Sequence, residues 1–150
     1  MCSSDIGDVL VAGRDIHIGI TSRSDAAAID QFRTIVGDHG YRVHGVGVRG
    51  CLHLKSAVTA VSDDTLVVNP ERVDTDALGD RRCIPVDPSE PAAANVVRVG
   101  DTVLVAAAFP RTAERIATAG FDVRYVDASE LAKAEGALTC CSRIFEAPTT

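Results

Sequence analysis

Two adjacent cysteines, Cys140 and Cys141, stand in the stretch EGALTCCSRIF and are candidates for covalent chemistry. A thiol becomes an effective nucleophile when a nearby base activates it and a carboxylate orients that base. His53 provides an imidazole and Asp5 provides a carboxylate, but both lie far from Cys140 in the sequence. Covalent catalysis by these three residues therefore requires a fold that brings distant segments together.

The chain contains an internal repeat that could provide such a fold. Three successive units each have the pattern of two strands around a tight turn, then a helix, then another strand. The units cover residues 5–48, 52–87 and 94–127, and a closing strand is expected at 137–145. The expected turns are Gly13-Arg14-Asp15, Ser62-Asp63-Asp64 and Gly100-Asp101. The pattern predicts a single domain of the α/β (α+β) class, built from repeated ββαβ modules that bury their apolar faces against one another.

The expected helices have recognisable faces and ends. The first helix should bury one face, formed by Ala28, Ile29, Phe32 and Ile35. Proline at the first turn loses no hydrogen bond, and glycine after the last turn adopts the left-handed conformation easily. On this basis, Pro70 and Gly79 should bracket the second helix, and Pro110 and Gly120 the third. A further short helix is expected in the stretch SELAKAEG.

The repeat predicts where the three reactive residues lie. Asp5 precedes the first unit, His53 stands at the entry to the second, and Cys140 stands where a fourth unit would begin. In a pseudo-symmetric ring these positions are equivalent, so the side chains should converge at one end of the central axis. Because side chains alternate along a strand, Cys140 should face the axis and Cys141 should point into the core.

Composition limits the classes of function. The 150 residues are 46% hydrophobic and carry a net charge of −6, which is enough apolar material for a core but not the basic surface that nucleic acids require. No apolar run reaches membrane-spanning length, and the sequence begins without a signal-peptide pattern. We therefore expect a cytoplasmic protein with free thiols and no nucleic-acid or membrane partner.

Several residues also have purely structural interpretations. Cys51, Cys83 and Cys141 fit the role of small apolar residues in a core. The Cys-x-His and Cys-Cys spacings are not those of a structural zinc site, and the sequence has no glycine-rich phosphate loop. We therefore expect neither a metal nor a cofactor.

Three motifs resemble a known family. CLHLKSAV at 51–58, EPAAANVVRV at 90–99 and EGALTCCS at 135–142 are similar to the dimethylarginine dimethylaminohydrolases of the guanidino-group-modifying pentein superfamily. The resemblance runs through essentially the whole chain. Arginine deiminases and amidinotransferases of that superfamily have an aspartate at the position of Lys55, so the sequence favours the dimethylarginine branch.

The resemblance implies a propeller, a closed ring of five ββαβ modules, of which this chain would form about three. It implies hydrolysis of methylated arginine to citrulline and methylamine or dimethylamine through a covalent thiouronium, without a cofactor. By position, Cys140 resembles the nucleophile, His53 the general acid and base, and Asp5 the acidic residue of an E/D-x-G-D pattern. Arg23 matches a residue that binds the substrate α-carboxylate, and Ala134 one whose backbone carbonyl contacts the substrate.

Two interpretations of function follow. Proteins of the family are longer, and the N-terminal modules that have no counterpart here hold a covering loop and further substrate-binding residues. The chain is therefore either an amidine hydrolase, complete or joined by a complementary N-terminal chain, or a non-catalytic remnant that binds guanidino compounds or another protein. Its expected partners are a small guanidino substrate and either that second chain or another copy of itself.

Overall fold

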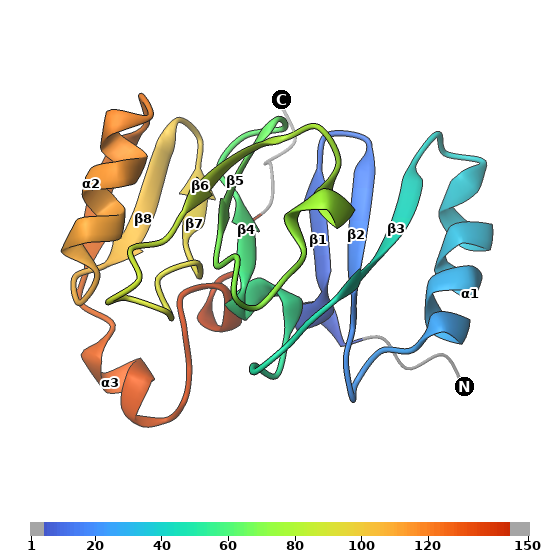
Figure 1. Ribbon diagram of the computed structural model, residues 1–150, viewed down its shortest axis with the longest axis horizontal. Helices are drawn as coiled ribbons and strands as arrows, with labels where there is room; N and C mark the ends of the chain where they lie inside the picture. Colours follow the sequence, from blue (N-terminus) through green and yellow to red (C-terminus); the bar gives the residue numbers. More distant parts are fainter. Residues whose placement is uncertain (1–4, 145–150) are drawn as a thin grey trace, which may run out of the picture.

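Three small sheets form a row in the computed structural model, which describes residues 5–144 (Figure 1). Helices α1 and α2 flank the two ends of this row. The strands are β1 (Val9–Ala12), β2 (Asp15–Ile20), β3 (Arg42–Gly47), β4 (Val58–Ala60), β5 (Thr65–Val68), β6 (Arg82–Pro85), β7 (Val97–Val99), β8 (Thr102–Ala106) and β9 (Asp122–Val126). The α-helices are α1 (Ala26–Gly37), α2 (Pro110–Thr118) and α3 (Ser129–Lys133).

The three sheets share one strand order. They read β1-β2-β3, β4-β5-β6 and β7-β8-β9, and in each the first pair is antiparallel and the second parallel. The mixed α/β class is therefore confirmed. No sheet within residues 5–144 closes on itself. None of the helices in the same range is long and apolar enough to cross a membrane.

Local sequence explains most boundaries of the first and third units. Gly13 and Gly100 both have φ of +59° in the hairpin turns, a conformation that favours glycine. Helix α2 begins at Pro110 and is followed by Gly120 at φ +104°, as predicted. In α1, the prediction that Ile35 is buried is wrong, because this residue is 66% exposed. Val36 packs against the core instead.

The middle unit differs from the expected pattern. Its helix does not begin near Pro70 but is a short 3-10 helix, η3 (Thr75–Leu78). The Asn69 side chain accepts a hydrogen bond from the Glu71 N–H, and the Asp74 side chain caps Asp76. These local bonds compete with a longer helix. Gly79, at φ +74°, ends the helix as predicted.

The prediction of a strand after α3 is also wrong over residues 137–144. This segment contains the 3-10 helix η4 (Thr139–Cys141) and no strand. The Cys140 N–H donates to the Ala137 carbonyl and the Cys141 N–H to the Leu138 carbonyl. These backbone groups bond within the turn and therefore do not pair with a neighbouring strand. As a result, Cys141 is exposed rather than buried in the core. Residue 145, the last of the expected strand, lies outside the described residues.

Neighbouring sheets share their apolar cores. One cluster joins the first two sheets and includes Leu10 and Val46 from the first with Leu66 and Val68 from the second. Another joins the second and third sheets and includes Val61, Val67, Val103, Val105 and Ile116. This continuous packing fixes the three units relative to one another, which is what a site assembled from several of them requires.

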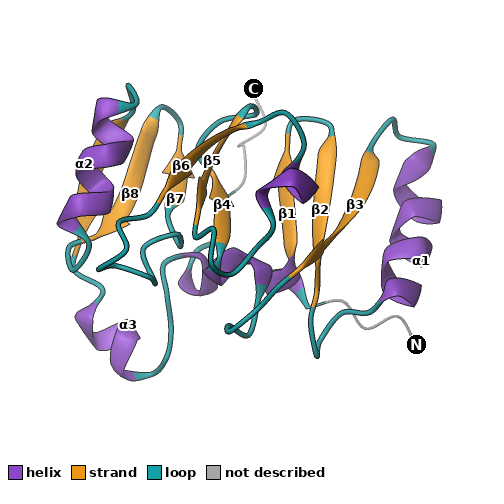
Figure 2. Cartoon of the chain, in the orientation of Figure 1, coloured by secondary structure: helices purple, strands orange, loops and turns teal. Residues whose placement is uncertain are grey.

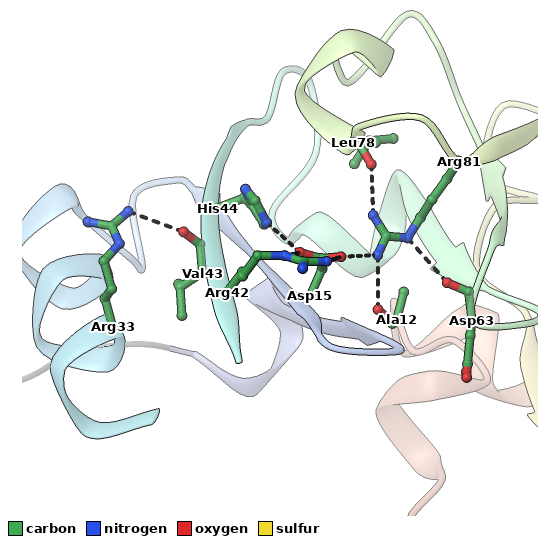
Figure 3. Close-up of polar contacts among 9 residues, drawn as sticks. All are labelled: Ala12, Asp15, Arg33, Arg42, Val43, His44, Asp63, Leu78 and Arg81. Atoms are coloured by element: carbon green, nitrogen blue, oxygen red, sulfur yellow. Dashed lines mark hydrogen bonds and ion pairs between the residues drawn. The ribbon is translucent and has the colours of Figure 1, made fainter. Parts of the chain in front are cut away.

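A polar cluster also links the first two sheets (Figure 3). Asp15, at the start of β2, accepts two hydrogen bonds from Arg42 at 2.7 Å each and one from Arg81 at 2.5 Å. His44 contacts the same carboxylate at 2.7 Å. Hydrogen bonds from Arg42, then Arg81 and His44, hold the pKa of Asp15 far below its usual range. Arg81 also donates to the Ala12 carbonyl, so it connects the second unit to the β1–β2 turn.

Candidate active site

Two short 3-10 helices, η1 (Ile6–Asp8) and η2 (Leu54–Ser56), bring Asp5 and His53 together. His53 Nε2 lies 3.1 Å from Asp5 Oδ2, and both side chains are partly shielded from solvent. This contact is short but not aligned as a hydrogen bond, so Nε2 has no hydrogen-bond partner among residues 5–144. The predicted convergence of these two residues is therefore observed.

The carboxylate of Asp5 is held in its charged form. Its Oδ1 accepts a hydrogen bond from the Gly7 N–H at 3.0 Å. This bond, with a smaller effect from His53, lowers the pKa of Asp5. Asp5 is therefore a carboxylate at neutral pH and can stabilise positive charge on the imidazole.

Gly7 gives the imidazole ring its space. A Cβ at this position would lie 2.7 Å from His53 Cγ and 2.9 Å from Cδ2, which is closer than real carbon contacts allow. The third position of DIGD must therefore lack a side chain for the ring to pack here. The E/D-x-G-D pattern thus has a steric as well as an electrostatic basis in this chain.

Asp8, a residue not singled out from the sequence, ties the two halves of the pair together. Its buried carboxylate accepts a hydrogen bond from the Leu54 N–H at 2.9 Å, directly after His53. It also accepts from the Ser24 hydroxyl at 2.9 Å, and Ser24 Oγ accepts from the Asp5 N–H at 3.2 Å. Its place as the last residue of the E/D-x-G-D pattern was the only signal in the sequence.

Cys140 lies on η4 as an exposed free thiol. It is close enough to the half-buried Lys55 for their charges to interact. Burial lowers the pKa of Lys55, and the negative charge of Cys140 opposes that shift. Since Lys55 follows His53 by two residues, the thiol segment and the imidazole segment are neighbours. Figure 2 shows the short helical turns of η1, η2 and η4 along the lower side of the row of sheets.

The two predicted substrate-binding residues are placed less directly. Arg23 follows β2, and its charge contributes to the low pKa of Asp5, so it lies near the pair. Its backbone N–H donates to the Thr21 hydroxyl at 3.0 Å. Ala134 is exposed at the end of α3, and its described N–H bond runs to Leu131 rather than to the pair. Glu135 follows at φ +56°, a conformation that is costly for a residue with a side chain.

A separate cavity of about 740 Å³ opens beside η2 and η4. Its wall includes Ser56 of η2, Leu138 next to η4 and several alanines between positions 92 and 137, but not Asp5, Arg23, His53 or Cys140. Cys51 also lines it, and burial raises the pKa of that thiol. Within residues 5–144, no group of three or more His, Cys, Asp or Glu side chains could hold a metal ion.

Comparison with known proteins relates this arrangement to guanidino-modifying enzymes. The N(G),N(G)-dimethylarginine dimethylaminohydrolase of Streptomyces coelicolor is 41% identical over 138 residues, which are 92% of this chain and 53% of the relative. That of Pseudomonas aeruginosa is 32% identical over 94% of this chain and 56% of the relative. A solved structure of a cysteine-to-serine variant of the P. aeruginosa enzyme with citrulline superposes with a TM-score of 0.77 at 30% identity, covering 89% of this chain and 52% of that one.

The three mixed sheets and the paired imidazole and carboxylate thus lie in a chain that resembles the dimethylarginine dimethylaminohydrolases in sequence and in fold. It spans about half the length of the curated relatives that it matches. No family model matches the sequence.

Proposed function

We propose that this chain hydrolyses Nω-methylated arginine to citrulline and methylamine or dimethylamine. One observation carries the proposal: Asp5 and His53 form a pair at 3.1 Å, beside the segment of Cys140, in a chain 41% identical to a dimethylarginine dimethylaminohydrolase. A carboxylate, an imidazole and a thiol are the groups that covalent hydrolysis of a guanidinium requires.

In the first half of the reaction, Cys140 attacks as a thiolate. A guanidinium is a poor electrophile because its charge is delocalised, so the attacking group must be a thiolate, which the positive charge of the bound substrate favours. The bond from Sγ to the guanidinium carbon forms, and the bond from that carbon to the methylated nitrogen breaks. His53 gives the departing amine its proton, and a thiouronium remains on Cys140.

In the second half, His53 works in the opposite direction. The neutral imidazole takes a proton from water, and the resulting hydroxide adds to the thiouronium carbon. The bond to Sγ then breaks and the proton of the added hydroxyl passes to solvent, which releases neutral citrulline and regenerates the thiolate. Asp5, whose pKa is low, stabilises His53 in its protonated form at both stages.

The amino-acid part of the substrate would be held by residues around the Asp5–His53 pair. Arg23 would bind the α-carboxylate through its planar guanidinium, which matches carboxylate geometry. The Ala134 carbonyl would accept a hydrogen bond from the substrate. Both assignments rest on position in the family pattern, and the nearness of Arg23 to Asp5 supports the first.

We also propose that the three sheets are modules of a five-module propeller, with units at 5–48, 52–87 and 94–127. The shared strand order supports this arrangement. The other modules would belong to a complementary N-terminal segment or chain, or another copy of this chain would cover the open side. We place the protein in the cytoplasm, where its cysteines stay reduced.

A second function is supported by the open arrangement of the sheets. No sheet closes within the described residues, and Cys140 is exposed to solvent, where water is not excluded from the reaction. The chain would then bind guanidino compounds or another protein without turnover. Its strand edges would pair with that protein.

Citrulline release from asymmetric dimethylarginine by the purified chain tests the first function. We expect slow release that Cys140→Ser abolishes, and arginine should be a poorer substrate. Binding of dimethylarginine without release, at equal strength in the wild type and in Cys140→Ser, would instead support the second function.

A further inference from the structure

One buried side chain, Asn95, contacts both segments that carry the proposed nucleophile and base. It lies in the loop before β7, and its residue is only 6% exposed. Its Nδ2 donates to the Lys55 carbonyl at 3.0 Å and to the Thr139 hydroxyl at 2.8 Å. Its Oδ1 accepts from the Thr139 N–H at 3.0 Å. Lys55 follows His53 by two residues, and Thr139 directly precedes Cys140.

These three bonds use almost the full capacity of the amide. A carboxamide has two N–H donors and a carbonyl acceptor. Here both ends of the group bond to residues that lie 40 or 44 positions away in the sequence. The two bonds to Thr139 fix that residue at its backbone and at its side chain. The bond to Lys55 then sets where η2 lies relative to η4.

The contacts differ from those of other buried polar groups in the same region. Asn69, which is 2% exposed, donates to the Pro91 carbonyl at 2.8 Å and accepts from the Glu71 N–H at 3.0 Å. Its side-chain bonds therefore join two loops and do not go to η2 or η4. Only its backbone N–H, which the substitution to alanine keeps, donates to Ala57 at the end of η2. Asn95 makes the same kind of bond but directs it to the two segments that form the site.

We propose that Asn95 is a positioning residue, which holds the Cys140 thiol in register with Lys55 and His53. The inference rests on the proposed function and deepens it, since the residue would act through Cys140 without touching the substrate. Cys140 is exposed, and the 3-10 helix that carries it has only three residues. Such a short element has little stability of its own, so its placement depends on tertiary bonds.

The direct test is the rate at which iodoacetamide alkylates Cys140, followed by peptide mass spectrometry that resolves it from Cys141. In Asn95→Ala, we expect Cys140 to react roughly 10-fold more slowly, because the thiol loses its fixed place beside the Lys55 and His53 segment. Cys141 should react as in the wild type. In the hydrolysis assay, kcat should fall by about 10- to 100-fold while KM changes little.

Asn69→Ala is the matched control. It also removes a buried amide and two hydrogen bonds, so its melting temperature should fall about as much, but Cys140 alkylation and kcat should stay as in the wild type. The alkylation assay needs no turnover, so it tests Asn95 even if the chain releases no citrulline. Wild-type alkylation of Cys140 in a folded Asn95→Ala protein would overturn the proposal, as would equal slowing in Asn69→Ala.

A milder variant covers the case in which Asn95→Ala does not fold. Thr139→Val keeps the shape of the side chain and the backbone bond to Asn95 but removes the hydroxyl partner. We expect the Cys140 rate to fall severalfold and the Cys141 rate to be unchanged. Unchanged reactivity of both thiols in this variant would count against the proposal.

Discussion

At the scale of single residues, the site depends on how closely the Asp5 and Asp8 segment approaches His53. Asp5 pairs with the imidazole ring, and Gly7 leaves room for that ring. Asp8 accepts a hydrogen bond from the N–H of Leu54, the residue after His53. These are contacts from one short segment, DIGD, to one loop. A change of a single methyl group in this segment should therefore displace the imidazole without unfolding the protein.

Gly7→Ala tests this close approach. The added methyl group would lie 2.7 Å from His53 Cγ, so the ring must move away from Asp5. We expect citrulline release to fall by about 10- to 100-fold with little change in the far-ultraviolet circular dichroism spectrum.

Gly47→Ala is the control for that substitution, because nothing lies within 4 Å of a Cβ at Gly47. It should retain wild-type activity. Full activity in Gly7→Ala would show that the ring tolerates displacement and that the observed pairing is not the one used in catalysis.

At the scale of elements, the sheets are joined by a few side chains as well as by their cores. Arg81, from the loop between η3 and β6, binds Asp15 and the carbonyls of Ala12 and Leu78. Its side chain is 14% exposed and that of Asp15 is 9% exposed. Without Arg81, Asp15 would keep its bonds from Arg42 and His44. The buried carboxylate and two carbonyls would each lose a donor, however, which is costly.

Arg81→Met should therefore lower the free energy of unfolding by about 2 to 4 kcal/mol in urea denaturation. Lys133→Met is the comparison, because the Lys133–Glu130 pair is exposed on α3. That change should cost less than about 1 kcal/mol. Equal losses in the two variants would mean that the Arg81 cluster does not join the sheets more strongly than a surface ion pair does.

How far the sequence predicts these elements depends on the range of the interactions involved. The turn at Gly13 and the ends of α2 follow from single residues and their neighbours, so they were predictable. The helix expected near Pro70 failed because the Asn69 and Asp74 side chains bond to the backbone locally. The placement of Cys141 failed for a long-range reason, since η4 replaces the expected strand and Asn95 anchors it from a distant loop.

The same distinction applies to the site. Asp5 and His53 were predicted to meet because the repeat placed them at equivalent positions, and they do. Asp8 and Asn95 were missed because nothing in their local sequence shows that their polar atoms bond to segments 46 or 40 positions away. Such roles become visible only once the packing of the units is known.

At the scale of the whole molecule, one buried group should make stability depend on pH. His17 on β2 is 1% exposed, and neither ring nitrogen has a hydrogen-bond partner among the described residues. Burial, with smaller effects of Arg81 and His44 and an opposing one of Asp15, lowers the pKa of His17 to about 4. The folded protein therefore keeps this imidazole neutral where the unfolded chain, with a pKa of about 6.5, takes up a proton.

The unfolded state thus binds more protons between pH 6.5 and 4, so stability should fall as the pH falls through that range. We expect a loss on the order of 3 kcal/mol in the free energy of unfolding, measured by urea denaturation from pH 7 to 4.5. His17→Leu should remove most of this slope, whereas His39→Gln, at an exposed position, should keep it. Identical slopes in the wild type and in His17→Leu would refute the assignment to His17.

Trapping the covalent intermediate would show whether Cys140 attacks a guanidinium carbon. The chain would be mixed with asymmetric dimethylarginine, quenched in acid, digested and analysed by mass spectrometry, with Cys140→Ser in parallel. We expect a thiouronium adduct on Cys140, absent from Cys141 and from the variant. Citrulline release without an adduct on Cys140, or an adduct on another cysteine, would contradict attack by Cys140.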